Sequence, residues 1–312
     1  MAIKQKNKSK EIQHLLSIKD MDLKTIEDIF LSADKYLQNK NINKYEILKG
    51  KTVCNLFFEN STRTQTTFEI AAKRLSADVI NLDIATSSQS KGESILDLIN
   101  NLIAMGVSIF VVRHSKPGIP ELIAKSIKNN ASIINAGDGN KEHPTQALLD
   151  AYTIRNFKKP FSNLKVAIVG DIEHSRVAKS EIYILNKLGT KEVRVIGPKT
   201  LMPKNIEEFN VKVFETMEQG LVDVDAILML RIQKERMKKD TIPSEKKYFE
   251  NFGLNKERLK YAKKDCLVLH PGPINRGVEI DSLVADGNQS VILEQVKNGI
   301  GIRMAVMEKM DK

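Results

Sequence analysis

The stretch TVCNLFFENSTRTQTTFE, residues 52–69, joins an apolar run to a segment rich in hydroxyl side chains. The run Thr52–Phe58 has the length and the β-branched and aromatic content of a buried strand. The segment after it predicts a helix over Thr62–Leu75, introduced by a Ser-Thr pair. A buried strand that passes through a short polar loop into a helix is the basic unit of an α/β fold with a parallel sheet.

Strand-like runs and helical patterns alternate along the rest of the chain. The first helix is predicted to start at a cap, Asp20 or Asp22, and to reach about Leu37. The other predicted strands are Val79–Leu82, Ile109–Val112, Ile133–Asn135, Val166–Val169, Val193–Ile196, Val211–Phe214, Ile227–Leu230 and Leu267–Leu269. The other predicted helices are Ser94–Met105, Ile119–Ser126, Pro144–Phe157, Arg176–Leu188 and a last one from about Val291. This order predicts an α/β protein with two doubly wound parallel-sheet domains joined by bridging helices.

The length of the chain agrees with two domains, because 312 residues exceed the usual size of one. The helix Pro144–Phe157 and the polar segment Lys158–Asn163 lie between the two halves and are predicted to bridge them. We expect a first domain over residues 1–144 and a second over 145–291. The last helix, within residues 292–312, is expected to return to the first domain.

Composition excludes several classes of protein. The chain contains no run of 18 apolar residues, which predicts no membrane span, and its basic start has no apolar core of a secretory signal. Cys54 and Cys266, the only cysteines, lie in apolar runs, which predicts buried thiols, no structural zinc and a cytoplasmic location. The net charge of +10 leaves nucleic-acid binding open as an alternative. Because the lysines are dispersed and aromatic residues make up 5% of the chain, we favour a solvated surface.

Polar clusters follow seven of the predicted strands. They contain hydroxyl, amide or cationic groups and four of the five histidines. They are Glu59–Thr64, Ser87–Ser94, Arg113–His114, the GDGNKEHPTQ segment with His143 and Gln146, Gly170–Arg176, Arg231–Gln233, and the HPGPINRG segment, His270–Gly277. Since α/β proteins bind ligands beyond the carboxyl ends of their strands, these clusters predict one polar binding rim.

The Ser61–Thr64 cluster has the chemistry of a phosphate site. It begins a helix, so backbone N–H groups and the helix dipole favour an anion there, and Arg63 adds a charged fork. An ordinary N-cap is the alternative, but it accounts for one hydroxyl and not for Arg63 and its neighbours. Neither GxxxxGK[ST] nor GxGxxG is present at a strand end.

Eight blocks of sequence, in order, resemble one family. They are STRTQTTFE, SKGES, VVRHS, INAGDGNKEHPTQALLD, VAIVGDIEHSRVAKSE, LMLRIQKER, LHPGPINRGVEI and NGIGIRMA, which together extend from Ser61 to Ala305. The chain resembles the catalytic chains of aspartate carbamoyltransferases, within the aspartate/ornithine carbamoyltransferase superfamily. Ornithine enzymes share the STRT block but usually carry a cysteine in the HPxQ block and an HCLP block, where this chain has Thr145 and Gly272. A related carbamoyltransferase that uses another amine acceptor, such as ornithine, is the alternative.

The resemblance implies a reaction of two anions: carbamoyl phosphate and L-aspartate give N-carbamoyl-L-aspartate and phosphate, a step of pyrimidine biosynthesis, without a cofactor or a metal. It makes residues 1–144 the carbamoyl phosphate-binding domain and 145–291 the aspartate-binding domain. It implies that Thr64, Arg113 and His143 are catalytic and polarise the carbonyl group. It assigns carbamoyl phosphate binding to Ser61, Thr62, Arg63, Thr64, Arg113, His143, Gln146, Pro271, Gly272 and Pro273. It assigns aspartate binding to Lys91, Arg176, Arg231 and Gln233. The two arginines would bind the carboxylates of aspartate through bidentate hydrogen bonds.

The resemblance also implies an assembly. In this family the loop that corresponds to Ser87 and Lys91 reaches into the neighbouring subunit's site, which predicts a homotrimer with shared sites; regulatory chains are a possible further partner. Domain closure is assigned to Glu59, which would pair with Arg176 and Arg236, and to Glu235, which would orient Arg231. Surface ion pairing of little energetic weight is the alternative for these acidic residues.

Overall fold

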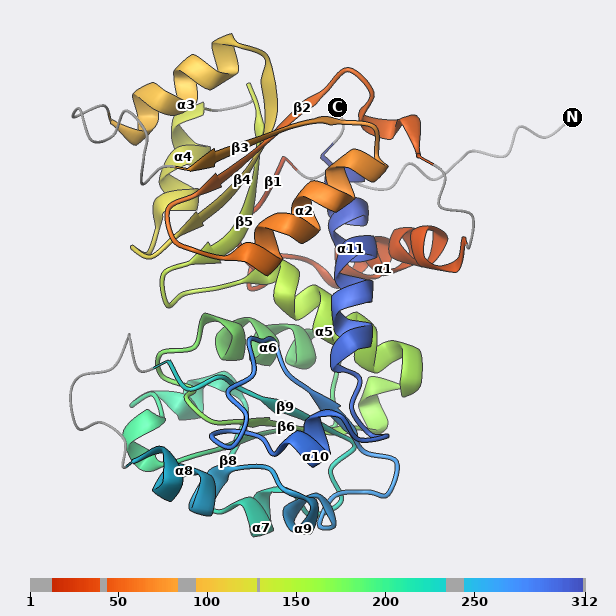
Figure 1. The fold of residues 1–312 in the computed structure, drawn as a ribbon, viewed down its shortest axis with the longest axis vertical. Coiled ribbons are helices and arrows are strands. Elements are labelled where there is room, and N and C mark those ends of the chain that lie inside the picture. The colour runs from red at the N-terminus through yellow and green to blue at the C-terminus, as the bar shows by residue number, and fades with distance from the viewer. Residues whose placement is uncertain (1–12, 40–43, 84–93, 128–129, 234–243, 311–312) are drawn as a thin grey trace, which may run out of the picture. The chain divides into compact units, whose positions relative to one another are not determined.

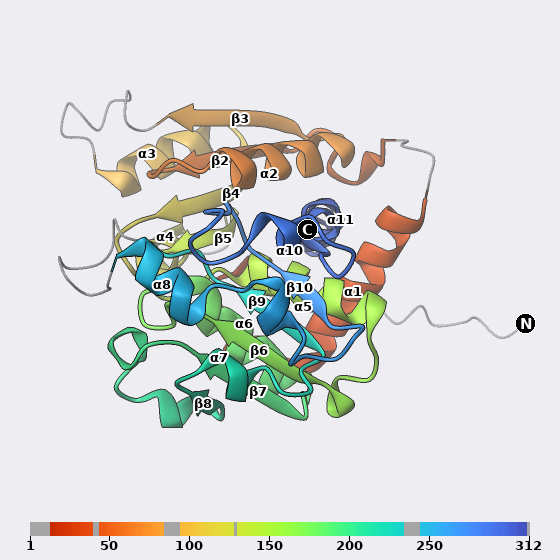
Figure 2. The same cartoon turned by 60° about the horizontal axis from the view of Figure 1, so that its bottom comes forward.

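The computed structural model describes residues 13–39, 44–83, 94–127, 130–233 and 244–310, which Figures 1 and 2 draw in colour. The chain divides into two compact units, each described here by itself. The first comprises Met1–Leu16, Asp20–Ala136 and Ile300–Lys312, and the second Ser17–Lys19 and Gly137–Gly299.

The first unit is built on a five-stranded parallel sheet in the order β1-β5-β4-β2-β3. Its strands are β1 (His14–Leu15), β2 (Thr52–Phe57), β3 (Asp78–Asp83), β4 (Val107–His114) and β5 (Ser132–Asp138), which runs on into the second unit. Its helices are α1 (Leu23–Gln38), α2 (Thr62–Arg74), α3 (Ile95–Ala104), α4 (Ile119–Ile127) and the end of α11 (Ile292–Glu308). Figure 1 shows α3 and α4 together on one face of this sheet and α2 on the other.

Alternation along the central strands accounts for this layering. Cys54 and Leu56 of β2, and Phe110 and Val112 of β4, pack with α3 and α4 in one apolar cluster. The residues between them point to the opposite face, because successive side chains of a strand alternate. Both faces of the sheet are therefore covered, as parallel sheets require.

The second unit repeats the design with a parallel sheet in the order β10-β9-β6-β7-β8. Its strands are β6 (Lys165–Val169), β7 (Glu192–Ile196), β8 (Lys212–Phe214), β9 (Ala226–Met229) and β10 (Leu267–Leu269). Its helices are α5 (Pro144–Phe157), α6 (Arg176–Lys187), α7 (Met217–Gly220), α8 (Glu245–Phe252), α9 (Lys256–Leu259), α10 (Ser282–Ala285) and the start of α11. Figure 1 shows α6 on one side of this sheet and α7 and α9 on the other, and α7 and α10 contribute to the apolar cluster on the second side.

The predicted fold class is confirmed: the chain forms two parallel α/β sheets, each flanked by helices. Every strand and helix predicted from the sequence is present, with ends that differ by a few residues. The two-residue strand β1 and the short helices α7, α8, α9 and α10 were not predicted. They are too short to show a hydrophobic period.

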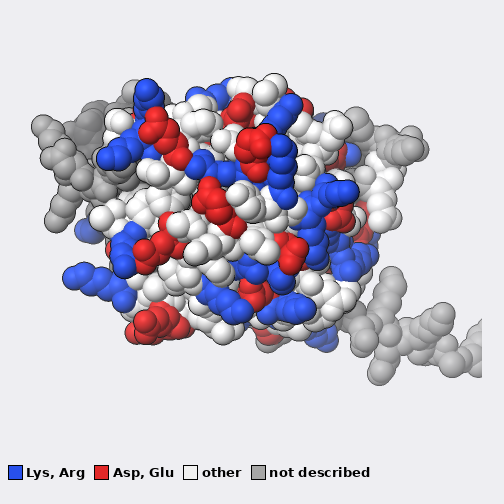
Figure 3. Space-filling model, turned by 90° about the horizontal axis from the view of Figure 1, so that it is seen from below, with Lys and Arg blue, Asp and Glu red and all other residues white. Residues whose placement is uncertain are grey.

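Charged side chains of both signs share the surface. Figure 3 shows Lys and Arg interspersed with Asp and Glu on the face seen from below. Several form ion pairs in the second unit, among them Lys212 with Glu192 at 2.5 Å and Lys263 with Asp225 at 2.6 Å. No helix in the described part of the chain is both long and apolar enough to cross a membrane.

Candidate active site

The loops that follow β2 and β4 leave the first sheet side by side. Phe57 lies opposite Arg113 in the parallel pairing of the two strands, and the backbone N–H of Phe58 donates to the carbonyl oxygen of Arg113 at 2.9 Å. The chain after Phe58 and the side chain of Arg113 therefore share the carboxyl edge of the sheet, where α/β proteins bind ligands.

Ser61 occupies the N-cap position of α2, but its hydroxyl makes no capping hydrogen bond. In α1 and α3, by contrast, Asp22 and Ser94 each accept a backbone N–H of the first helical turn, at 2.7 and 3.1 Å. The capping explanation of the hydroxyl therefore fails at Ser61. The start of α2, with Thr62 and Arg63 exposed, presents a hydroxyl and helix N-terminal N–H groups at the sheet edge.

Arg113 is held by an acidic partner within the first unit. Its Nε lies 2.7 Å from Oε1 of Glu59, and its Nη1 donates to the carbonyl oxygen of Ala136 at 3.2 Å. Sequence reasoning paired Glu59 with other arginines and missed this contact. The strand order would have indicated this contact, because β2 and β4 are neighbours. Glu59 follows β2, and Arg113 lies near the end of β4. The role of Glu59 in domain closure stays a prediction.

In the second unit three adjacent strands bring together the loops that lead to Arg176, to Arg231 and Gln233, and to the Pro271–Pro273 segment. β10, β9 and β6 are neighbours in the sheet, and the backbone N–H of Leu230 donates to the carbonyl oxygen of Val169 at 2.9 Å. Arg231 and Gln233 follow β9 directly and are partly exposed. The predicted site residues Ser87, Lys91, Glu235 and Arg236 lie outside the described residues.

Arg176 is the first residue of α6 and is buried, with 3% of its surface exposed. Ser175 caps the helix by accepting the N–H of Ala178 at 3.1 Å. The Nη1 of Arg176 donates to the carbonyl oxygen of Gly139 at 3.3 Å, and the guanidinium packs on Gly137. A Cβ at position 137 would lie 2.8 Å from Cζ of Arg176, and Gly137 has φ +135°. Only glycine suits this backbone and this close approach.

His143 and Gln146 lie at the start of α5 and are both buried. The backbone N–H of His143 donates to Oγ of Ser180 at 2.9 Å, which ties the start of α5 to α6. Nε2 of Gln146 lies 2.9 and 3.1 Å from the two oxygens of Asp150, one helical turn further on. The orientation of the Gln146 amide is therefore fixed from within the helix.

The loop after β10 is organised by His270. Its Nδ1 accepts the backbone N–H of Gly272 at 2.7 Å, so Nε2 is the protonated nitrogen, and it faces Oε1 of Glu279 at 3.1 Å. The same Glu279 oxygen accepts the N–H of Asn275 at 2.6 Å. The ring of His270 thus shapes the loop that carries Pro271, Gly272 and Pro273.

The loop after β6 is fixed in a similar way. Oδ1 of the buried Asp171 accepts the backbone N–H of His174 at 3.1 Å and lies 2.9 Å from Nδ1 of the same residue. Burial raises the pKa of Asp171, and the hydrogen bonds from His174 partly oppose that effect. His174 is therefore a structural contact of its own loop.

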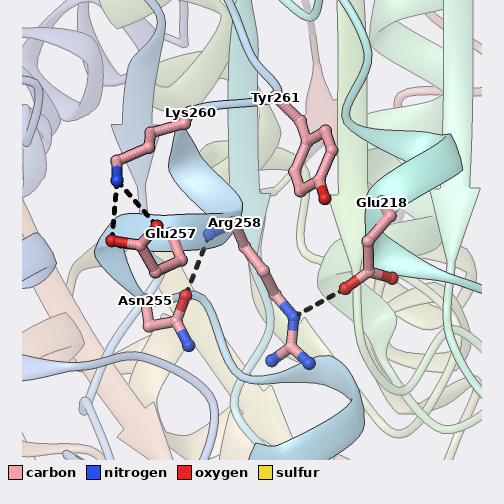
Figure 4. Close-up of a pocket in the computed structure, with 6 residues that line it drawn as sticks. All are labelled: Glu218, Asn255, Glu257, Arg258, Lys260 and Tyr261. Carbon is pink, nitrogen blue, oxygen red and sulfur yellow. Dashed lines mark hydrogen bonds and ion pairs between the residues drawn. The ribbon is translucent and has the colours of Figure 1, made fainter.

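The second unit also has a pocket that is separate from the loops described above. It is lined by Glu218, Asn255, Glu257, Arg258, Lys260 and Tyr261 (Figure 4). Its arginine is already engaged, because Nε of Arg258 faces Glu218 at 3.2 Å and Nη1 donates to the carbonyl oxygen of Gly253 at 2.7 Å. The carbonyl oxygen of Tyr261 accepts the N–H of Asp223, which precedes β9. The pocket therefore lies at the amino ends of the strands, away from the predicted rim.

Both cysteines lie in the interior of the protein. Cys54 and Cys266 are fully buried and unpaired with each other, and burial raises the pKa of each thiol to about 12. In the described ranges no group of three or more His, Cys, Asp or Glu is placed to hold a metal ion.

Two family models match nearly the whole chain. The model for the carbamoyl-P binding domain of aspartate/ornithine carbamoyltransferase matches residues 13–156. The model for the Asp/Orn binding domain of the same family matches residues 162–310. The chain belongs to the aspartate/ornithine carbamoyltransferase family. The resemblance found in its sequence blocks is thereby confirmed.

Solved structures of carbamoyltransferases share the fold. Aspartate transcarbamoylase from Trypanosoma cruzi, in complex with carbamoyl aspartate and phosphate, is 26% identical with a TM-score of 0.85, over 97% of this chain and 96% of that one. The same enzyme with carbamoyl phosphate and aspartate gives the same identity and TM-score, over 97% and 98%. Ornithine carbamoyltransferase from Thermus thermophilus is 25% identical with a TM-score of 0.85, over 96% and 99%. These likenesses do not separate the two acceptors.

Sequence reasoning missed three buried residues of this carbamoyltransferase that lie behind the predicted site: Asp150, Glu181 and Gln295. Asp150 could have been found, since the spacing of Gln146 and Asp150 in TQALLD is that of a helical i,i+4 pair. Gln295 contacts Asp150 from a distant segment of the chain, and no local pattern predicts that contact.

Proposed function

We propose that this carbamoyltransferase uses L-aspartate as its acceptor and forms N-carbamoyl-L-aspartate and phosphate, a step of de novo pyrimidine biosynthesis. The observation that carries the proposal is the content of the loops after β6 and β9. They supply Arg176, Arg231 and Gln233, which are cationic or amide groups suited to two carboxylates. An ornithine side chain is cationic and would call for acidic partners instead.

The residues of the first unit would hold carbamoyl phosphate by its phosphate group. Ser61 and Thr62 supply hydroxyls and the start of α2 supplies N–H groups, while Arg63 adds charge. Thr64 and Arg113 would face the carbonyl oxygen, where negative charge develops as the amine attacks. The ion pair with Glu59 limits the directions in which the guanidinium of Arg113 can turn.

The second unit would contribute His143 to the same carbonyl oxygen and Gln146 to the carbamoyl amide. The carbonyl oxygens of Pro271 and Gly272 would accept hydrogen bonds from that amide, and Pro273 completes the loop. The amine nitrogen of aspartate forms a bond to the carbonyl carbon, the bond from that carbon to the phosphate oxygen breaks, and phosphate leaves. The amine proton would pass to the departing phosphate. Holding both anions in place does most of the work.

The proposal extends to assembly and location. It takes the protein to be a cytoplasmic homotrimer in which Ser87 and Lys91 act in the neighbouring subunit's site. Mixing inactive Lys91→Ala and Arg63→Ala chains tests the shared site, because a mixed trimer contains one site with both residues intact. A mixture that stays inactive after subunit exchange contradicts shared sites.

A substrate panel tests the proposed acceptor. Purified protein is given carbamoyl phosphate with aspartate, ornithine or other amino acids, and the carbamoylated product is measured. We expect turnover with aspartate; turnover with ornithine alone would overturn the assignment. Arg63→Ala should abolish turnover and keep the fold, while Thr66→Ala, exposed on the same helix, should keep both.

A further inference from the structure

A single buried carboxylate supports two separate parts of the proposed carbamoyl end of the site. Asp150 of α5 is fully buried and contacts Nε2 of Gln146 with both of its oxygens, at 2.9 and 3.1 Å. A carboxylate only accepts hydrogen bonds, so the –NH₂ end of Gln146 must face it. The oxygen of the Gln146 amide is thereby the end that is turned away from Asp150.

The same carboxylate reaches the loop after β10 through Gln295 of α11. Nε2 of Gln295 donates to Oδ1 of Asp150 at 2.6 Å, and Oε1 of Gln295 accepts the backbone N–H of His270 at 2.9 Å. The two bonds require opposite ends of one amide, so they fix its orientation. Gln146 and the start of the HPGP loop are thus joined by hydrogen bonds through Asp150.

Glu181 of α6 completes the group. It is 1% exposed, and burial, followed by the charge of Asp150 and a hydrogen bond to it, raises the pKa of Glu181 well above its usual value. The raised pKa favours the neutral form of the Glu181 carboxyl, which can donate its proton to Asp150. Among the described residues, Oε1 of Glu181 accepts no hydrogen bond, which suits a neutral carboxyl better than a buried carboxylate.

We propose that Asp150, with Glu181 beside it, is the positioning unit that makes the site selective for a ligand bearing an –NH₂ group. It turns the Gln146 amide so that its oxygen accepts from that group, and it holds the His270 loop through Gln295. This inference rests on the proposed binding of carbamoyl phosphate. Asp150 and Glu181 touch Gln146 or each other rather than the ligand, so they are positioning residues.

Acetyl phosphate is the probe that separates positioning from general stability. It has a methyl group where carbamoyl phosphate has –NH₂, so it shares the phosphate and carbonyl contacts but cannot donate to Gln146. The ratio of the acetyl phosphate inhibition constant to the carbamoyl phosphate dissociation constant therefore measures selectivity for –NH₂. A variant that is merely less stable changes both constants together and leaves the ratio where it was.

Three variants test the proposal. Glu181→Gln keeps a neutral hydrogen-bond donor, and we expect the ratio to stay within about twofold of the wild-type value. Glu181→Leu removes the donor, and Asp150→Asn replaces an acceptor oxygen by a donor; each should lower the ratio by about tenfold, the effect of one well-formed hydrogen bond. If Glu181→Leu does not fold, the isosteric Asp150→Asn carries the test.

Failure of the inference and failure of the proposed function give different results. If the wild-type protein transfers carbamoyl groups and Asp150→Asn keeps the wild-type ratio, the positioning role is overturned and the proposed function stands. If the wild-type protein neither transfers carbamoyl groups nor prefers carbamoyl phosphate over acetyl phosphate, the proposed function itself fails, and the inference fails with it. A lowered ratio in Asp150→Asn and Glu181→Leu, with recovery in Glu181→Gln, supports the proposal.

Discussion

The buried carboxyl of Glu181 should make the stability of the protein fall as the pH rises. A carboxyl whose pKa is higher in the folded than in the unfolded state binds more protons when folded. Its contribution is complete below the unfolded-state pKa of about 4.3 and is lost as the pH rises through the folded-state pKa. Burial, and then Asp150, raise the folded-state value for Glu181. Among the described residues, the charged group that contributes to this rise is the Asp150 carboxyl of α5.

Glu181→Gln removes the titration and keeps a donor toward Asp150. The free energy of unfolding of the wild type, relative to this variant, should decline by about 1.4 kcal/mol per pH unit above about pH 4.3, up to the folded-state pKa. Other titrating groups are common to both proteins and cancel in the comparison.

Urea unfolding followed by far-ultraviolet circular dichroism measures this difference, since the chain has no tryptophan to serve as a fluorescent probe. Glu69→Gln is the matched control. Hydrogen bonds, first from Lys73, lower the pKa of Glu69, so its contribution is lost only as the pH falls below about 4.3 and is constant between about pH 5 and pH 7. Parallel curves for the wild type and Glu181→Gln would refute the reasoning and show that Glu181 is ionised in the folded protein.

Three further predictions concern the backbone, the cap and the thiols. Gly137→Ala would place a Cβ 2.8 Å from Cζ of Arg176 and should raise the KM for aspartate by about tenfold; an unchanged KM in steady-state kinetics would contradict this. Ser94→Ala should cost about 1 kcal/mol of stability, because Ser94 caps α3. Ser61→Ala should cost less than about 0.5 kcal/mol, because the Ser61 side chain makes no capping hydrogen bond. Equal losses of the two variants in urea unfolding would contradict both predictions. The two cysteines, with pKa values of about 12, should resist a thiol-specific chromogenic reagent at about pH 8 until urea unfolds the chain; rapid colour in the folded protein would contradict their burial.

Local patterns were enough to predict the main elements of the fold. The run Thr52–Phe58 and the helix after it appear as β2 and α2 because an apolar strand and an amphipathic helix each carry their own period. Strand order is not written in any local pattern. It decides that Arg113 lies beside the end of β2 and meets Glu59, and this is why the pairing of Glu59 was not predicted.

The candidate site shows the same division. The residues proposed to touch substrate have polar or cationic side chains in loops, and the sequence blocks marked them. The residues that hold them, Asp150, Glu181 and Gln295, lie inside helices and are buried. They interact over sequence separations that no period reveals: Gln295 and Asp150 are 145 positions apart. Supporting contacts of this kind become visible only when the packing of helices is known.

The protonation of Glu181 matters because the proposed ligands are anions. Asp150 already places one negative charge behind Gln146, and two ionised carboxyls in contact would repel each other in a region with little water. A neutral Glu181 leaves the pair with one negative charge, on Asp150. The oxygens of Asp150 accept hydrogen bonds from Gln146 and Gln295. The pair can then orient both amides while opposing the approach of carbamoyl phosphate less than two carboxylates would. Glutamine at position 181 should serve as well as a protonated glutamate, whereas aspartate, one methylene shorter, should draw the donor away from Asp150 and lower the preference for –NH₂ over methyl.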